Sequence, residues 1–279
     1  MTRNRSRNRK RSGRSKGGES YLIKALAIST ITAVVAVIIG MMYLNFTTNK
    51  PEIDPETLCD TRADVEDVVA ILIDATEGLP TRSAKNATIY LNNIIQNLPP
   101  NSLINLYAIK SGNEDHITPV ASMCKPRRGV EINALTGNQR FADKLFIEGF
   151  QVPVTNLIND LINEGPSTTS PLIESIQSAV LESFLSYPNA GMDKIIVISD
   201  MIQNTGLYSF YSNHPSYPNY KEKNIKNGRG ILNLNGIEVN LLIVPRNYPT
   251  GSRQDLVKFW SELLKDSGAK NGSTMEPLS

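Results

Sequence analysis

The sequence predicts a three-layer α/β fold, in which helices cover both faces of a mostly parallel sheet and one antiparallel hairpin lies near an edge. Short apolar runs such as 68–73 (V-V-A-I-L-I) and 194–199 (K-I-I-V-I-S) have the length and composition of strands buried on both faces. Segments with apolar residues at helical spacing alternate with these runs, which is typical of parallel strands joined by crossover helices. Two further runs, 103–109 and 116–123, are separated mainly by turn residues, which indicates the hairpin.

The expected elements follow the order β, α, β, β, α, α, β, β, α. The expected strands are 68–73, 103–109, 116–123, 194–199 and 236–244, and the expected helices are 81–98, 139–163, 171–187 and 253–265. Prolines support several of these boundaries. Pro99 stops the first helix, Pro171 fits the first position of the third, and Pro153 interrupts the helical pattern of 139–163.

The N-terminal residues 1–20 form a basic tail that we expect to be disordered, because no apolar residue follows Met1. Residues 1–24 carry nine Lys and Arg against one Glu. Residues 25–279 carry the remaining 20 Lys and Arg against 26 Asp and Glu. The positive charge therefore belongs to the tail, and the rest of the chain is acidic.

Residues 21–46 are predicted to form a transmembrane anchor. The 22 residues from Ala25 to Phe46 contain no charge, which is enough to cross about 30 Å of hydrocarbon at about 1.5 Å per residue. A cleavable signal peptide is the alternative, but this run is longer than a signal core and no A-x-A site follows it. The positive-inside rule then predicts a single-pass protein with a cytoplasmic N-terminus and a periplasmic or extracellular domain.

The two cysteines, Cys59 and Cys124, both lie on the side of the anchor that is expected to cross the membrane. An oxidising compartment favours a disulfide between them. Two unrelated buried thiols are the alternative. We expect a linker at 47–60 before the domain and a flexible C-terminal tail at 269–279.

Polar residues follow two of the predicted parallel strands and precede one helix. Asp74 and Thr76 follow the first strand, Thr169 and Ser170 lie in the loop before the third helix, and Asp200 follows the strand 194–199. In an open α/β sheet these positions meet at the edge where ligands bind. Carboxylate and hydroxyl oxygens are the ligands that Mg²⁺ prefers. The alternative is that the carboxylates cap helices or accept hydrogen bonds from loop amides.

With these residues, the segment 61–268 resembles the von Willebrand factor A-type (integrin I-like) domain. Asp74 and Thr76 match the start of that family's D-x-S-x-S motif, Ser170 begins a segment similar to its T-P-L, and Asp200 resembles the Asp of its T-D-G. Gly78 stands where the third residue of the first motif would be a serine, so the motif is degenerate. The resemblance implies a metal-ion-dependent adhesion site that binds Mg²⁺ and is completed by a carboxylate of a partner protein.

The segment 201–234 is a long insertion rich in Tyr and Asn between two strands. Loops of this length in compact domains are usually functional or disordered, and tyrosine suits protein recognition. The alternative is an ordered elaboration that packs over the edge of the sheet. The residues expected to contact a partner are Tyr208, Phe210, Tyr211, Tyr217 and Tyr220.

The predicted function is that of a membrane-anchored module that binds another protein, in a membrane or envelope complex. The only histidines, His116 and His214, belong to no recognised catalytic motif, and a small-molecule substrate is not expected. One alternative is a metal-assisted hydrolase that uses Asp74 and Asp200. A second is contact of the Arg-rich tail with nucleic acid or lipid, and the acidic domain disfavours nucleic acid.

Overall fold

The structure, a computed structural model, describes residues 17–47, 51–76, 78–112, 116–134, 137–163 and 167–278. The chain divides into two units, Met1–Lys50 and Pro51–Ser279.

In the part of the first unit that the structure describes, the chain forms one helix, α1 (Gly17–Thr47). Its segment Ile23–Tyr43 has a mean hydropathy of 2.4 and is long and apolar enough to cross a membrane, judged by length and composition. Hydroxyl groups within this apolar stretch bond back to the helix, as when Ser29 Oγ donates to the carbonyl of Leu26 at 2.9 Å. Of the tail predicted at 1–20, residues 1–16 lie outside the described residues, and residues 17–20 belong to α1.

The second unit contains a sheet of six strands in the order β3-β2-β1-β4-β5-β6. The strands are β1 (Val68–Asp74), β2 (Leu103–Ile109), β3 (Ala121–Cys124), β4 (Asp193–Ser199), β5 (Glu238–Ile243) and β6 (Thr274–Pro277). Every pairing is parallel except that of β2 with β3. The predicted fold class is therefore confirmed. From β1 the chain adds β2 and β3 on one side of the sheet and then β4, β5 and β6 on the other. The topological switch point therefore lies between β1 and β4.

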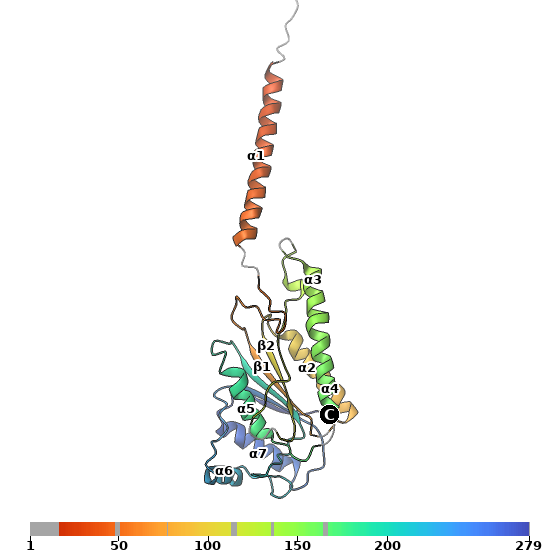
Figure 1. Ribbon diagram of the computed structural model, residues 1–279, viewed down its shortest axis with the longest axis vertical. Coiled ribbons are helices and arrows are strands. Elements are labelled where there is room, and N and C mark those ends of the chain that lie inside the picture. Colours follow the sequence, from red (N-terminus) through yellow and green to blue (C-terminus); the bar gives the residue numbers. More distant parts are fainter. Residues whose placement is uncertain are drawn as a thin grey trace, which may run out of the picture. The chain divides into compact units, whose positions relative to one another are not determined.

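Helices cover both faces of this sheet (Figure 1). They are α2 (Thr81–Asn97), α3 (Gln139–Lys144), α4 (Val152–Ile162), α5 (Leu172–Phe184), α6 (Tyr217–Lys226) and α7 (Arg253–Asp266), with a short 3₁₀ turn η1 (Gly129–Glu131) and a π-helical segment η2 (Leu145–Gln151). Side chains alternate between the faces of a strand. Val69 and Ile71 of β1 therefore pack with α2 and α4, and Ala70 and Leu72 pack with α5 and α7.

The long helical pattern of 139–163 forms one continuous path of α3, η2 and α4 and is not broken at Pro153. A proline removes one helical hydrogen bond and its ring clashes with the carbonyl four residues earlier. That carbonyl belongs to Gly149, which lies within η2. The wider π-helical turn accommodates the proline, so the expected interruption becomes a local change of helical period.

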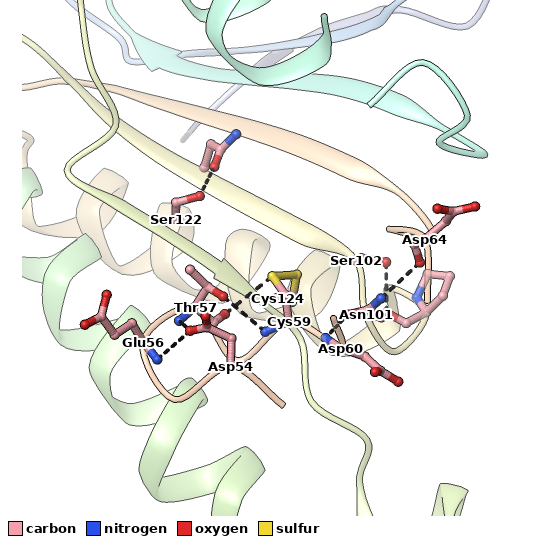
Figure 2. The surroundings of a disulfide bond; sticks show 12 residues. Asp54, Glu56, Thr57, Cys59, Asp60, Asp64, Asn101, Ser102, Ser122 and Cys124 are labelled. Atoms are coloured by element: carbon pink, nitrogen blue, oxygen red, sulfur yellow. Dashed lines mark hydrogen bonds between the residues drawn. A yellow bond between two sulfur atoms is a disulfide. The ribbon is translucent and has the colours of Figure 1, made fainter. Parts of the chain in front are cut away.

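The predicted disulfide is present and joins Cys59 to Cys124 (Figure 2). It is reinforced by hydrogen bonds, because the Cys124 amide donates to the Thr57 carbonyl at 2.7 Å and the Asp60 amide donates to Asn101 Oδ1 at 2.8 Å. Residues 51–60, expected to be a linker, are thus part of the domain. The disulfide and these hydrogen bonds hold them there, and the hydrogen bonds leave no signal in the Pro-containing sequence.

Two further expectations are corrected by the structure, and the insertion contains regular structure. The predicted strand 116–123 is reduced to β3, because the Ile117 amide bonds to Ser178 Oγ of α5 at 2.9 Å and its side chain is buried. The insertion 201–234 contains a helix, α6. Of the flexible tail expected at 269–279, residues 269–278 are ordered, since β6 pairs with β5 and the Leu278 side chain is 5% exposed, and residue 279 lies outside the described residues.

Candidate functional site at the switch point

The carboxyl ends of β1 and β4 bring the sequence-predicted polar residues together. The two strands run parallel with Ile73 opposite Ile198, so Asp74 is level with Ser199 and Asp200 follows one residue later at the same edge of the sheet. This crevice at the switch point is where open α/β sheets bind ligands. We call the group formed by Asp74, Thr76, Ser170, Ser199, Asp200 and Arg246 the edge cluster.

Asp74 is the centre of the edge cluster and is only 5% exposed. Its Oδ1 accepts hydrogen bonds from the Thr76 amide at 3.0 Å and from the Thr76 hydroxyl at 2.5 Å. Its Oδ2 accepts from Ser199 Oγ at 2.6 Å and from Ser170 Oγ at 3.3 Å. A carboxylate offers about four acceptor positions, and here four donors occupy them. The charge is therefore stabilised in the fold by donors from three separate segments.

The loop that carries Ser170 is held by backbone pairing with the segment after β4. The Ser170 amide donates to the Asn204 carbonyl, and the Asn204 amide donates back to the Ser170 carbonyl, both at 2.9 Å. The Thr169 hydroxyl instead donates to Ser111 Oγ at 3.0 Å. Of the two hydroxyls that the sequence places in this loop, Ser170 contacts Asp74, and Thr169 belongs to a neighbouring hydroxyl group.

Asp200 is bound differently from Asp74. Its Oδ1 accepts from the Ile202 amide at 2.9 Å, and its Oδ2 lies 3.5 Å from Nε of Arg246. The same guanidinium donates from Nη2 to the Gly78 carbonyl at 2.9 Å. Both side chains are largely shielded, with Asp200 11% and Arg246 26% exposed. An arginine therefore places a permanent positive charge inside the edge cluster.

Two small cavities adjoin the edge cluster. One, of about 10 Å³, lies between Asp74, Asp200 and Arg246, and the other, of about 20 Å³, lies between Thr76, Ser170 and Tyr211. A single water needs about 10–15 Å³ of such volume, whereas pockets for small molecules span about 300–1,000 Å³. The edge therefore has room for a water or an ion, and any larger ligand must bind across its surface.

The residues present do not fit the divalent cation that the family resemblance implies. In the described parts of the chain, no three His, Cys, Asp or Glu side chains gather as they would around a metal. The hydroxyl groups and Asp74 supply suitable oxygens, but Asp200 is already paired with a guanidinium. Two unit charges about 4 Å apart interact by about 4 kcal/mol at an effective dielectric constant of 20, so this arginine opposes a doubly charged ion.

Four of the five aromatic residues predicted to contact a partner are instead buried in the core. They surround Phe259 of α7, with ring centroids 6.1 Å away for Tyr208, 4.8 Å for Phe210, 6.0 Å for Tyr217 and 5.7 Å for Tyr220. Burial raises the pKa of the Tyr220 hydroxyl well above its usual range. The expectation of a partner surface is wrong for these four, because one stacked and three edge-to-face contacts with Phe259 hold their rings inside the core.

Tyr211 is the exception, with 51% of its surface exposed, and it borders the cavity beside Thr76. It lies in the segment after Asp200 and next to Ser209, whose hydroxyl donates to Asn204 Oδ1 at 2.7 Å. Of the five aromatic residues, Tyr211 alone is placed where it can contact a partner at this edge.

Two members of the edge cluster, Ser199 and Arg246, are not predicted by sequence reasoning. Ser199 precedes Asp200 and could have been found, since the last residue of a strand lies at the same edge as the residue after it. Arg246 carries no such signal. It follows β5 in the segment V-P-R-N, and only the pairing of β5 with β4 brings it to Asp200.

A second group of polar side chains has the residue types of a hydrolase but not the arrangement. Ser178 Oγ lies 3.3 Å from Nδ1 of His116, whose Nε2 lies 3.5 Å from Glu182 Oε1. Ser178 is buried in the middle of α5, and its hydroxyl accepts the Ile117 amide at 2.9 Å. Its oxygen holds the backbone before β3, so this serine has a structural role.

Comparison with known proteins gives matches in structure only. No protein-family model matches the chain, and no curated protein sequence matches it. The similar solved structures include an aerotolerance-related membrane protein of Bacteroides fragilis carrying multiple mutations to serine, with 13% identity, a TM-score of 0.35, and coverage of 76% of this chain and 92% of that one.

A von Willebrand factor type A protein of Catenulispora acidiphila also matches, with 13% identity and a TM-score of 0.35 over 76% of this chain and 38% of that one. The manganese-loaded TRAP protein of Plasmodium vivax matches with 12% identity and a TM-score of 0.31 over 72% of this chain and 63% of that one. Von Willebrand A domains are thus among the solved structures similar to this chain, whose own sheet order and helical layers carry the assignment of its fold class.

Proposed function

We propose that residues 51–278 form a protein-interaction module that binds its partner with the edge cluster and the loop beside it. The observation that carries this proposal is the convergence of Asp74 and Asp200 at the switch point, with their charges already stabilised. Preorganised polar groups at this position provide a rigid surface for recognition. The adjoining cavities are far smaller than a metabolite pocket, which favours a macromolecular partner over a small molecule.

The contact surface consists of the edge cluster and an exposed rim of hydroxyl groups. The hydroxyls of Thr168 and Thr169 both bond to Ser111 Oγ in this rim, and Tyr211 contributes a large exposed ring. Tyrosine and hydroxyl side chains supply contact area and adaptable hydrogen bonds at low cost in entropy. The domain is acidic, which favours a protein over a nucleic acid as the partner.

The role is one of binding and not of catalysis. Asp74 accepts hydrogen bonds at both oxygens, and Asp200 is paired with Arg246, so neither is arranged as a general acid or base toward an open pocket. A metal-assisted hydrolase would need the cation that Arg246 opposes. Turnover that depends on Asp74 would contradict this proposal.

We further propose that α1 anchors the chain in a membrane, with the basic N-terminus in the cytoplasm and the domain in the periplasm or another oxidising space. The length and hydropathy of Ile23–Tyr43 support the anchor, and the Cys59–Cys124 disulfide supports the oxidising compartment. Alkaline phosphatase fused after residue 278 should be active in intact cells, because this enzyme is active only in an oxidising compartment. Inactivity of the fusion in intact cells would reverse the assigned orientation.

Site-specific photocrosslinking in the native membrane tests the binding surface. A photoreactive residue at Tyr211 should give a discrete adduct with a protein partner, whereas one at Leu181 of α5, which is 54% exposed, should not. A Thr168→Arg substitution, which enlarges the rim, should reduce the Tyr211 adduct by at least about tenfold, equivalent to about 1.4 kcal/mol. Equal adducts from both positions, or an adduct unaffected by Thr168→Arg, would move the binding surface elsewhere.

A further inference from the structure

We propose that Arg246 supplies the positive charge of the edge cluster, so that the partner is bound without a divalent cation. This inference deepens the proposed function and rests on it only for the identity of the binding edge. It follows from the mismatch between the resemblance, which implies a metal ion, and the contacts of Asp200, which are those of an ion pair.

The sheet places Arg246 at this position. Ser199 of β4 pairs with Ile243 of β5, and the Val244 amide extends the ladder by donating to the Ser199 carbonyl at 2.8 Å. The chain then leaves the sheet through Pro245, and the side chain of Arg246 returns over the carboxyl end of β4 to Asp200. Because backbone pairing continues to within two residues of Arg246, the guanidinium has a defined position.

Arg246 also joins two loops that a metal ion would otherwise bring together. Its Nε lies 3.5 Å from Asp200 Oδ2, after β4, and its Nη2 donates to the Gly78 carbonyl, after β1, at 2.9 Å. Gly78 stands where the resembling family has its third motif residue, a hydroxyl ligand. Gly78 lacks the hydroxyl of the family pattern, and Arg246 bonds to the carbonyl of this same residue. The guanidinium therefore lies where the hydroxyl ligand is missing.

The replacement changes which ligand the edge favours. Asp74, Asp200 and Arg246 together carry one net negative charge, whereas a divalent cation with the two carboxylates would be neutral and would offer open coordination positions. The edge therefore gives no advantage to a carboxylate of the partner. It favours neutral hydrogen-bonding groups, such as amides and hydroxyls, which suit the rim formed by Thr168, Thr169 and Tyr211.

Titration of Mn²⁺ into the purified full-length chain in detergent, followed by calorimetry, tests this inference in the absence of any partner. The wild type should show no saturable binding. Arg246→Ala leaves the two carboxylates without their cation and should gain saturable binding, in the range of about 0.1–1 mM known for weak extracellular calcium sites. Adding Asp74→Ala to that variant should abolish the gain.

Arg246→Lys is the matched control, since it keeps the positive charge and should bind no Mn²⁺. The unfolding midpoint, read from Trp260 fluorescence, shows that each variant is folded, and Arg246→Gln replaces Arg246→Ala if the latter is not. Saturable binding to the wild type that is lost in Asp74→Ala would overturn the inference. So would a folded Arg246→Ala or Arg246→Gln variant that binds no better than the wild type.

The crosslinked adduct at Tyr211 separates this inference from the proposed function. With Arg246 as the cation, the yield of the adduct should be unchanged when EDTA removes divalent ions. An adduct that forms but disappears in EDTA would overturn the metal-independent edge and leave the proposed binding function in place. The Mn²⁺ titration needs no partner, so its result stands even where no adduct forms.

Discussion

Two carboxylates lie at each end of the same pair of strands, and their surroundings differ. At the carboxyl end, Asp74 accepts four hydrogen bonds and Asp200 is bonded to an amide and paired with Arg246. At the amino end, Asp67 precedes β1 and Asp193 begins β4. Oδ1 of Asp193 is buried and has no hydrogen-bond partner among the residues that the structure describes.

The pKa values of the two carboxyl groups at the amino end follow from their surroundings. Burial raises the pKa of Asp193, and the nearby charge of Asp67 raises it further. Burial likewise raises the pKa of Asp67, against the hydrogen bond from the Met192 amide and the attraction of Lys194. A carboxylate at the end of a buried strand is thus not a site by itself. Its surroundings differ from end to end, since four donors bond to Asp74 at the carboxyl end, whereas burial and a neighbouring carboxylate raise the pKa of Asp193 at the amino end.

The largest expected effect comes from the aromatic packing that covers the carboxyl end. Phe259→Ala removes the ring that four aromatic side chains of the segment 201–234 contact, and should lower the free energy of unfolding by about 3–5 kcal/mol. Chemical denaturation followed by the fluorescence of Trp260, the single tryptophan, measures this loss. Tyr211→Ala is the matched control and should change stability by less than about 0.5 kcal/mol. A large loss for Tyr211→Ala would mean that its ring is buried in solution.

The disulfide gives the next largest effect and acts near the amino end of the sheet, where Cys124 pairs with Leu103 at the start of β2. The cysteines are 65 residues apart, and opening a loop of this length should cost about 2–4 kcal/mol. The double variant Cys59→Ser with Cys124→Ser should unfold at lower denaturant concentration but still give the Tyr211 adduct when folded. Loss of the adduct in the folded variant would show that the two ends are coupled.

Asp74→Asn should lower the free energy of unfolding by about 2 kcal/mol, because hydrogen bonds to a charged acceptor contribute about 1.5–3 kcal/mol and the new amide places a donor among donors. The partner adduct at Tyr211 should fall in the same variant. Denaturation of the purified protein measures the first effect and crosslinking the second. A stability equal to that of the wild type would show that the four hydrogen bonds are not formed in solution.

The smallest expected effect has the opposite sign. The pKa of Asp193 is raised in the folded state, so the folded protein binds its proton more tightly than the unfolded chain does, and stability from this group is lost as the pH rises through the raised pKa. Asp193→Asn should therefore stabilise the protein at neutral pH, by less than about 1 kcal/mol because solvent screens a partly exposed group. The gain should shrink toward about pH 4, near the usual pKa of Asp.

Denaturation midpoints of Asp193→Asn and the wild type at the two pH values measure this difference. A loss of stability in Asp193→Asn at neutral pH would show that its charge is compensated by a group from the other side of the sheet.

Local sequence was sufficient for the main elements of the fold and for four of the six members of the edge cluster. Runs of β-branched residues are strands because they can be buried on both faces, and the polar residues directly after β1 and β4 must then lie at one edge. The single pair of cysteines left one possible intramolecular disulfide. These conclusions depend on neighbours in the sequence or on a rule of parallel sheets.

The tertiary structure alone decided the rest. Tyr208 contacts Phe259, which lies 51 positions later in α7. The composition of the segment 201–234 would be the same if Tyr208 faced solvent, so the packing of α7 decides its environment. The strand β6 is only four residues long and ends in a proline, so it is recognised by its pairing with β5 and not by its pattern. Arg246 is an ordinary surface-type residue in sequence. The order of the strands brings the guanidinium to Asp200. Contacts between distant segments leave no periodic signal in the sequence, so this position could not have been predicted.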